Sequence, residues 1–598
     1  MNHAEKEKLR NMRHVAVHLL AFAVSKYFSG DAKLGAGQVL EEGFYYDFLL
    51  PRTLKPEDLS AIEKEFLAVL KNSKALNLKQ FPAEEAEHLF ADQPFKLEIL
   101  KDFIIGSVDE FGNWQEGSRR DTVSVVEFNS QVDLCDNPTV DSIHIVPEAA
   151  KLLSFSSAYW RGDSKNPSMQ RIYGTIWPDK NQLDSFLARM EEAKKRDHRK
   201  IGKAQELFLI SPEVGPGLPL WLPKGAIIRR EVEEFVYREQ VKRGYQFVYT
   251  PHVGRKALWE TSGHWNLYKD KMFAPMNMED GDYLVKPMSC PMHMMMFRSA
   301  QRSYKDLPIR LAETATVYRR EQTGELSGLV RVRSITQDDA HIFLRPDQLR
   351  QEFALVLDQA LYELGVFDFK DFEMWVSVRD PRNKQKYLGS DDMWDQAESS
   401  IVHALQEKGL SFTRAEGEAK FYGPALDVML KDSIGRQWQC TTIQVDFMLP
   451  ERFDLEYVDE DNKAKRPVVL HRALLGSMER FIGILIEHYA GIFPVWLAPT
   501  QVVVIPLSDK FASYGNKVVE QLSVNGVRVE MDNRSERMQY RIREAVTQKV
   551  PYVVVVGDRE SSSDSVSVRK RGSNEAESMK LTDFVGLVRD SINSKKNL

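Results

Sequence analysis

The stretch LPIRLAETATVYRREQTGELSGLVRVRSITQDDAHIF, residues 307–343, decides the fold of the largest part of the chain. Apolar and polar residues alternate at both of its ends, the pattern of two β-strands that each bury one face. The polar segment between them contains glycine and favours a loop. The stretch therefore predicts a β-hairpin.

Arginines are spaced along this hairpin at Arg319, Arg331 and Arg333, and Arg480 follows near the start of a helix predicted within residues 468–489. The planar fork of a guanidinium grips phosphate at two points, so arginines on a rigid hairpin suit a triphosphate. Each arginine taken alone is equally compatible with ordinary solvent-exposed charge.

The rest of the chain suggests an α+β multidomain protein. Strands such as QWQCTTIQVDFML, mixed with helices, predict a largely antiparallel sheet. The last hundred or so residues alternate strand and helix, as in QVVVIPL, VRVEMD and YVVVVGD, which predicts a βαβ domain. We expect four parts: an α+β domain at 1–178, a connecting helix at 179–202, a central domain at 203–497 and an α/β domain at 498–598.

Composition excludes several classes of protein. The 598 residues are 43% hydrophobic and 28% charged, which is ordinary for a globular protein and excludes a long disordered or collagen-like chain. The net charge of −6 argues against a uniformly cationic nucleic-acid coat. Three cysteines are too few for a disulfide framework, so we expect a reducing, cytoplasmic location. No run of 18 apolar residues predicts a membrane span.

Several motifs resemble those of a known family. The hairpin and the helix carrying Arg480 resemble motifs 2 and 3 of the class II aminoacyl-tRNA synthetases, and EFVYREQVKRGYQFVYTPHV resembles motif 1. Over nearly the whole chain and in order, the sequence is similar to threonyl-tRNA synthetases in KPMSCPMH, TQDDAHIF, FYGP, HRALLGSMERFIGIL and WLAPTQV. The resemblance implies a class II antiparallel catalytic core that joins L-threonine to tRNA(Thr), using ATP and a threonyl-adenylate. It also implies a homodimer, with Pro251 at the interface position of motif 1.

The family binds one zinc ion per subunit through a cysteine and two histidines, and the matching positions here are Cys290, His341 and His471. Taken singly, each also fits a buried core residue. Three protein ligands leave Zn²⁺ an open position, which by resemblance the amine and hydroxyl of threonine fill. Valine lacks that hydroxyl, and a site built around a polar contact rejects such an analogue by about 10⁴-fold or more.

The same resemblance assigns further roles around the reacting groups. Arg319 matches a contact to the α-phosphate and carboxylate, Glu321 an adenine contact, and His264 a residue that assists the ribose hydroxyl during transfer. Mg²⁺ is expected beside the phosphates. The remaining matches are nucleotide contacts at Arg331 and Arg480, and threonine-pocket positions at Gln337, Asp339, Tyr422 and Gln444.

A second, hydrolytic site is expected near the N-terminus. Serine differs from threonine by one methyl, which is worth only about 1 to 3 kcal/mol, so some mischarging follows. His14 and His18 share one face of the opening helix, a spacing that alone also fits a zinc-binding pair or two satisfied polar residues. By resemblance they belong to an editing site with Lys96, Asp133 and Cys135.

The sequence departs from the family pattern at a few positions. Thr139 stands four residues after Cys135, where the family usually has a histidine, and His144 lies five residues further on. In the synthetic site the unusual residues are Ile335, Ala425 and Thr441. We also expect the chain to lack the small β-rich domain that opens most family members.

The last part of the chain resembles an anticodon-binding domain. Unpaired bases are read through their exposed edges and by stacking, so such a domain need not be strongly cationic. Glu560 and Arg569 match base contacts of the family, although either also fits plain surface charge.

Two other readings compete with a threonyl enzyme. A class II enzyme for another amino acid is one, but a prolyl or seryl enzyme would not need the cysteine and two histidines. A non-catalytic RNA-binding relative is the other, and retention of Arg319, Glu321 and Arg480 argues against it.

Overall fold

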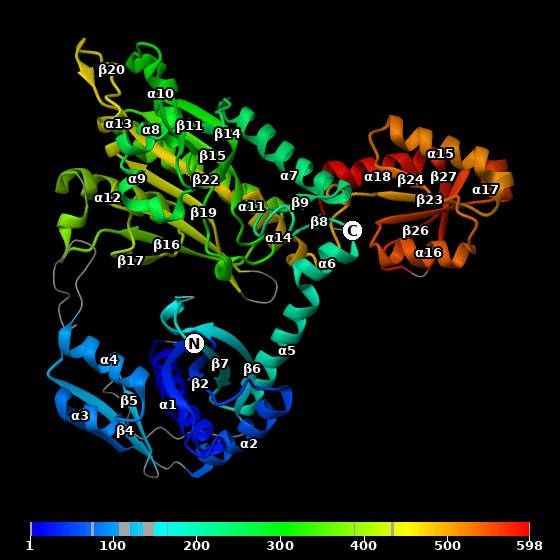
Figure 1. Cartoon of the computed structure of the whole chain (residues 1–598). Coiled ribbons are helices and arrows are strands. Elements are labelled where there is room, and N and C mark those ends of the chain that lie inside the picture. Colours follow the sequence, from blue (N-terminus) through cyan, green and yellow to red (C-terminus); the bar gives the residue numbers. More distant parts are fainter. Residues whose placement is uncertain are drawn as a thin grey trace. The chain divides into compact units, whose positions relative to one another are not determined.

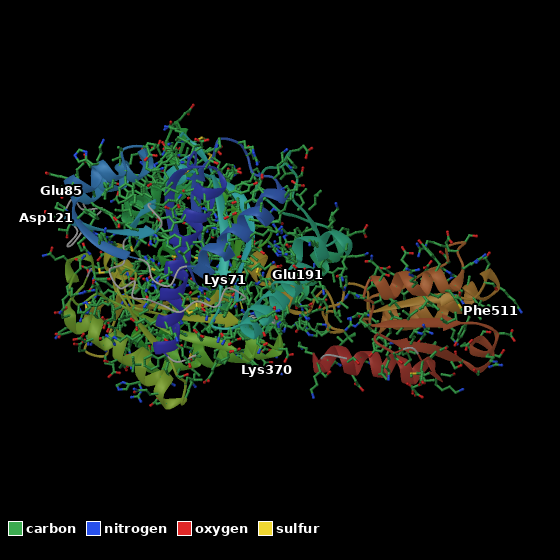
Figure 2. The ribbon with its side chains drawn as sticks, turned by 90° about the horizontal axis from the view of Figure 1, so that it is seen from below. Lys71, Glu85, Asp121, Glu191, Lys370 and Phe511 are labelled. Carbon is green, nitrogen blue, oxygen red and sulfur yellow. The ribbon has the colours of Figure 1, made fainter. Side chains whose placement is uncertain are left out.

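A computed structural model describes residues 3–72, 77–106, 120–128, 131–135, 149–163, 165–387, 389–431, 436–573 and 575–596 (Figure 1). The chain divides into two compact units, residues 1–191 and 192–598. The boundary, at Glu191 (labelled in Figure 2), falls inside helix α5 (Lys180–Arg196). Asp197 then caps helix α6 (His198–Ala204). The four-part division expected from the sequence stays a prediction.

The first unit is built on helix α1 (His3–Tyr27) and a four-stranded antiparallel sheet. Apolar α1 side chains such as Leu19 and Phe22 are buried with Phe44 and Phe48 of the sheet, which fixes the helix against one face. Helix α2 (Pro56–Asn72) packs beside α1. In spatial order the strands are β1 (Lys33–Leu40), β2 (Gly43–Leu49), β7 (Ser168–Ile176) and β6 (Ala150–Tyr159).

A smaller antiparallel sheet completes this unit. It contains β3 (Asn77–Pro82), β4 (Thr122–Phe128) and β5 (Gln131–Cys135), and helices α3 (Ala83–Leu89) and α4 (Pro94–Ile105) pack on it. The short strand β5 carries Asp133 and Cys135 to contacts with α1.

The second unit contains an eight-stranded sheet in which the predicted hairpin supplies the second and third strands. Strands β14 (Ile309–Tyr318) and β15 (Ser334–Leu344) pair antiparallel from Ile309–Phe343 to Tyr318–Ser334. The end pairs β10–β14 and β16–β17 are parallel and the others antiparallel. The full order is β10 (Gln246–Phe247), β14, β15, β22 (Val468–Ser477), β19 (Gln437–Asp446), β18 (Ala425–Lys431), β16 (Phe372–Val378) and β17 (Thr413–Glu416). The predicted antiparallel core is confirmed.

The two faces of this sheet have different neighbours. Ala340, Ile342 and Leu344 of β15 are buried with apolar side chains of α11 (Leu349–Val366). Because successive strand residues point to opposite faces, the positions between them lie on the other face. Phe343, for example, packs with Phe297 of α10 (Cys290–Arg298). This other face is where the candidate site forms.

Further helices and strands surround the sheet. The longer ones are α7 (Pro223–Lys242), α12 (Asp391–Glu407) and α14 (Met478–His488). The shorter ones are β8 (Phe208–Leu209), β9 (Leu220–Trp221), β11 (Val253–Arg255), α8 (Ala257–Thr261), α9 (His264–Tyr268), β12 (Met276–Met278), β13 (Gly281–Val285), α13 (Met448–Arg452), β20 (Tyr457–Val458) and β21 (Ala464–Lys465).

The C-terminal part forms a five-stranded sheet with helices on both faces (Figure 1). Val502 and Val504 are buried against α15 (Ala512–Val524) and α18 (Leu581–Ser594), whereas Val503 and Ile505 face α16 (Met538–Thr547). The strand order is β24 (Val529–Met531), β23 (Val502–Pro506), β25 (Tyr552–Val556), β26 (Ser565–Lys570) and β27 (Glu577–Lys580). The first three are parallel, so the predicted α/β architecture is confirmed.

Among the described residues, no helix combines the length and the apolar character needed to cross a membrane.

Candidate active site and metal centre

Three neighbouring strands line up a row of predicted site residues. His341 on β15 lies directly across from His471 on β22, and Gln444 on β19 lies across from His471 on its other side. Gln337 and Asp339 precede His341 on β15 at the spacing that keeps them on one face of the sheet. The sheet register therefore brings together residues that are far apart in sequence.

Cys290, His341 and His471 form a compact cluster on this face. Cys290 begins α10, and the potential ligand atoms of the three side chains all lie within 4.8 Å of one another. Nδ1 of His341 lies 2.8 Å from Nδ1 of His293, whereas the buried Nε2 of His341 has no hydrogen-bond partner among the described residues. Nε2 of His471 lies 2.8 Å from a carboxylate oxygen of Asp446. One nitrogen of each ring is thus held by a neighbour, which leaves the other as a ligand atom.

The pKa shifts differ among the three side chains of the cluster. Burial, and after it the positive charge of His471, lowers the pKa of His341 well below its usual range. This ring is therefore neutral, as a metal ligand must be. Burial opposes protonation of His471, but its hydrogen bonds with Asp446 and Cys290 raise its pKa to about 10. Burial raises the pKa of the Cys290 thiol. One sulfur and two imidazoles in a buried site are the donor set that suits Zn²⁺.

Sequence reasoning missed three residues that support this centre: Ser289, His293 and Asp446. The hydroxyl of Ser289 donates a hydrogen bond to Asp339. Two signals could have found the others. His293 follows Cys290 at i, i+3 on a helix, which places both on one side, and Asp446 follows Gln444 by two on a strand, which places both on one face.

Tyr422 and His264 also lie beside the centre. The hydroxyl of Tyr422 donates to Oε1 of Gln444 at 3.1 Å, and its ring lies 6.1 Å from that of His471 and 6.4 Å from that of His264. His264 is the first residue of α9 and is buried, with Nδ1 2.7 Å from the hydroxyl oxygen of Ser262. Burial lowers the pKa of His264 to about 4, so the ring is neutral near pH 7.

Arg319 and Arg480 present guanidinium groups at the same hairpin. Arg319 directly follows β14; its buried Nε makes no hydrogen bond within the part of the chain that the structure describes. Nε of Arg480 donates to the carbonyl of Val330 at 3.0 Å, and burial lowers the pKa of Arg480. The backbone N–H of Arg480 donates to the capping hydroxyl of Ser477 at 3.0 Å, which fixes the start of α14.

Glu321 and Arg331, both predicted nucleotide contacts, lie in the loop between β14 and β15 and pair with each other at 3.1 Å. Arg331 also pairs with Glu325 at 3.0 Å, and Glu325 pairs with Lys271 at 3.1 Å. The loop therefore carries a network of opposite charges.

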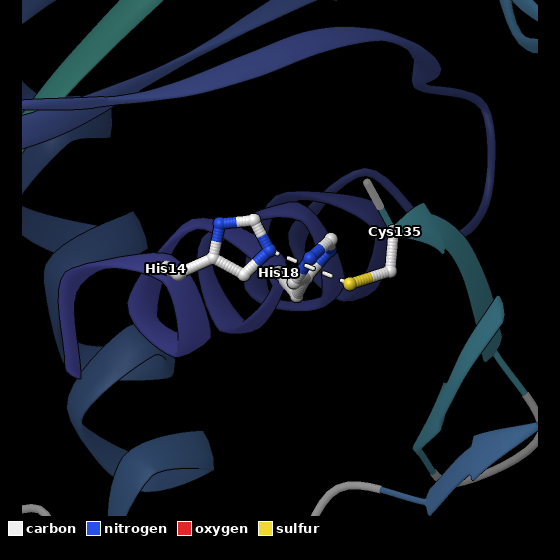
Figure 3. Close-up of side chains that lie close together, drawn as sticks. All are labelled: His14, His18 and Cys135. Atoms are coloured by element: carbon white, nitrogen blue, oxygen red, sulfur yellow. Dashed lines mark hydrogen bonds between the residues drawn. The ribbon is translucent and has the colours of Figure 1, made fainter. Parts of the chain in front are cut away.

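The five predicted editing residues come together in the first unit. His14 and His18 on α1 face Cys135 on β5, with Nε2 of His14 3.4 Å from Sγ of Cys135 (Figure 3). Nδ1 of His18 lies 2.6 Å from Asp133, and Nζ of Lys96 lies 2.7 Å from the other oxygen of the same carboxylate. Thr139 and His144 lie outside the described residues.

Interactions among these buried side chains shift the pKa values of Cys135 and His18. Burial alone would raise the pKa of the Cys135 thiol, but the neighbouring imidazoles of His14 and His18 lower it to about 6. Burial likewise opposes protonation of His18, but Asp133 raises the pKa of His18 to about 9. Tyr46, which sequence reasoning missed, donates to Asp133 at 2.8 Å.

The two predicted anticodon contacts lie in the C-terminal part. Glu560 is in α17 (Asp558–Ser563), where Oε2 accepts a hydrogen bond from the N–H of Gly557 at 2.9 Å. Arg569 is on β26, paired with Val553 of β25. Both side chains are partly exposed, and their role stays a prediction.

Comparison with known proteins gives the family. Residues 273–489 match the model of the tRNA synthetase class II core domain (G, H, P, S and T), and residues 501–591 match the anticodon binding domain. The threonine–tRNA ligase of Sulfurihydrogenibium sp. (strain YO3AOP1) is 46% identical over 99% of this chain and 90% of the relative. The threonine–tRNA ligase of Dehalococcoides mccartyi (strain ATCC BAA-2266 / KCTC 15142 / 195) is 46% identical over 98% of this chain and 97% of the relative.

A solved structure of a threonyl-tRNA synthetase is also similar to this chain. The RNA binding domain of threonyl-tRNA synthetase from Cryptosporidium parvum Iowa II has a TM-score of 0.63 and 36% identity, covering 66% of this chain and 98% of that one. With the antiparallel core and its arginine-bearing hairpin, these matches define a class II aminoacyl-tRNA synthetase. Within that class, the chain belongs to the threonine–tRNA ligase family.

Proposed function

We propose that the protein ligates L-threonine to tRNA(Thr) in two steps. The threonine carboxylate attacks the α-phosphate of ATP to give threonyl-adenylate and pyrophosphate. A ribose hydroxyl of the terminal adenosine of tRNA then attacks the adenylate carbonyl, and AMP leaves. Such chemistry depends mainly on positioning and on neutralising developing charge.

ATP binds along the hairpin in this proposal. Arg319 contacts the α-phosphate and the threonine carboxylate, Arg480 and Arg331 contact the nucleotide, and Glu321 contacts adenine. Mg²⁺ accompanies the phosphates. Nε of Arg319 is buried and has no hydrogen-bond partner among the described residues, which supports this assignment because an anionic substrate would supply one.

Threonine binds at the cluster on the sheet. Cys290, His341 and His471 would hold Zn²⁺, which supplies Lewis-acid positions for an amine and a hydroxyl when bound. Asp339 accepts a hydrogen bond from the hydroxyl, while Ser289 fixes the orientation of its carboxylate. The other pocket residues are Gln337, Tyr422 and Gln444.

Residues outside the ATP and threonine sites complete the proposal. Neutral His264 accepts a proton from the ribose hydroxyl, in keeping with its low pKa. Glu560 and Arg569 read anticodon bases, and two copies of the chain form a homodimer through the motif 1 region around Pro251.

One observation carries the proposal: three ligand atoms from distant parts of the chain lie within 4.8 Å of one another beside the hairpin arginines. The test is amino-acid-dependent exchange of pyrophosphate into ATP with threonine, serine, valine and proline. We expect the fastest exchange with threonine, weaker exchange with serine, and exchange with valine lower by about 10⁴-fold or more, because valine offers no hydroxyl. Exchange with none of the four would favour a non-catalytic RNA-binding protein, and exchange only with proline would favour a relative for that amino acid.

We also propose hydrolytic editing of Ser-tRNA(Thr) in the first unit. A thiol whose pKa is about 6, buried beside two imidazoles and a lysine–aspartate pair, favours proton-transfer chemistry there. The full chain is expected to deacylate Ser-tRNA(Thr) well above the spontaneous rate and to spare Thr-tRNA(Thr). Replacing His14 by alanine should slow the hydrolysis by about 10²-fold, the usual contribution of a proton-transfer group.

An exposed histidine of the same unit provides a control for His14→Ala. His88→Ala changes an exposed histidine on α3 of the same unit and should leave deacylation unchanged. Hydrolysis by the unaltered chain at no more than the background rate would refute editing.

A further inference from the structure

The chain contains a second cluster with the donor set of the candidate zinc centre. His14, His18 and Cys135 offer two imidazoles and one sulfur, and their potential ligand atoms all lie within 4.8 Å of one another (Figure 3). We propose that this cluster is a transition-metal site of its own, one that binds Zn²⁺. Metal binding at this cluster, in the protein without substrate, requires neither of the reactions proposed above.

One imidazole nitrogen of the cluster has no hydrogen-bond partner among the described residues. Nε2 of His18 is buried and makes no hydrogen bond in the described ranges of the chain, and the whole residue is only 3% exposed. A buried polar atom left in this state destabilises the folded protein. His341 of the other cluster shows the same feature at the same ring atom. A metal ion would satisfy both.

A carboxylate supports the other ring nitrogen of His18. Metal-binding histidines usually donate their other ring N–H to a carboxylate, which fixes the ring and its tautomer. Nδ1 of His18 contacts Asp133 at 2.6 Å, as His471 contacts Asp446 at 2.8 Å. The same architecture therefore occurs in both clusters.

Asp133 is itself held rigidly. Its side chain is fully buried and receives hydrogen bonds from the hydroxyl of Tyr46 at 2.8 Å and the N–H of Leu134 at 2.9 Å. Its ion pair with Lys96 at 2.7 Å compensates its charge. The aspartate is thus an orienting group, and Cys135 supplies the sulfur atom of the cluster.

The choice of metal follows from the ligands. Sulfur and imidazole favour Zn²⁺ and similar ions, whereas Mg²⁺ and Ca²⁺ need oxygen ligands. His14 is partly exposed, so one side of the cluster is open to solvent. Three protein ligands would leave an open position for water.

The test is metal content of the full chain after saturation with Zn²⁺ and removal of excess ion. We expect two equivalents for the unaltered protein and for Cys440→Ser, a buried cysteine outside both clusters. One equivalent should remain after Cys135→Ser, after Cys290→Ser, or after His14→Ala, which changes a partly exposed side chain. The double variant Cys135→Ser/Cys290→Ser should bind none.

Replacing Zn²⁺ by Co²⁺ shows whether a cysteine sulfur binds the metal ion. Absorption from cobalt–thiolate charge transfer should persist in Cys290→Ser and vanish in the double variant. A single equivalent that Cys290→Ser removes and Cys135→Ser leaves intact would overturn the inference. So would two equivalents that survive both Cys135→Ser and His14→Ala. Because no substrate is present, a failure of aminoacylation or editing would not affect this result.

Discussion

Replacing His341 by alanine is expected to release the metal ion of the active site and to lower threonine-dependent pyrophosphate exchange by about 10⁴-fold or more. The magnitude follows from the loss of the contact that recognises the threonine hydroxyl. His341 is buried in the sheet directly opposite His471, so the substitution removes one of the three potential ligand side chains of the cluster. Metal content and exchange rate should be measured on the same preparation.

Two further histidine substitutions sharpen this prediction. His293 touches His341 without being a proposed ligand, so His293→Ala should weaken metal binding by about 10- to 100-fold and leave exchange recoverable at high Zn²⁺. His403→Ala changes an exposed residue of α12 and should have no effect. If His341→Ala loses the ion and still activates threonine at the original rate, the proposed role of the metal is wrong.

The strands of the catalytic core were predictable because their pattern is local. Residues 309–318 and 334–344 alternate polar and apolar side chains, and a glycine-containing loop joins them, so the hairpin and its register follow from the chain itself. The parallel strands of the C-terminal part were predictable for a similar reason. Valine-rich strands such as 502–506 alternate with amphipathic helices, and such units form parallel sheets.

The candidate sites needed a different kind of information. Cys290 lies 51 residues before His341, and only the resemblance to a family connected the two; the strand register then explains why they meet. Tyr46 was missed because it acts through a contact from another element, to Asp133. Local pattern carries no signal for such packing.

The second large effect is expected at Arg319. Replacing it by alanine should lower threonine-dependent exchange by about 10²- to 10³-fold, the loss typical of removing one donor to developing transition-state charge. Arg319 is fixed by its own backbone, whose N–H donates to the carbonyl of Arg333 at 2.9 Å, and its Nε is buried without a partner among the described residues. An ion pair with the phosphate of the substrate would replace the hydrogen bonds with water that Nε of Arg319 loses on burial. Lysine cannot reproduce the two-point contact of a guanidinium with phosphate.

Arg320 provides a matched control beside it. Its side chain is exposed, so Arg320→Ala should change exchange less than about 2-fold, in line with the small value of exposed charges. Arg319→Lys should recover only part of the loss, because an ammonium keeps the charge and loses the fork geometry. Equal rates for Arg319→Ala and Arg320→Ala would contradict the phosphate role. Full rescue by lysine would instead show that charge alone matters at this position.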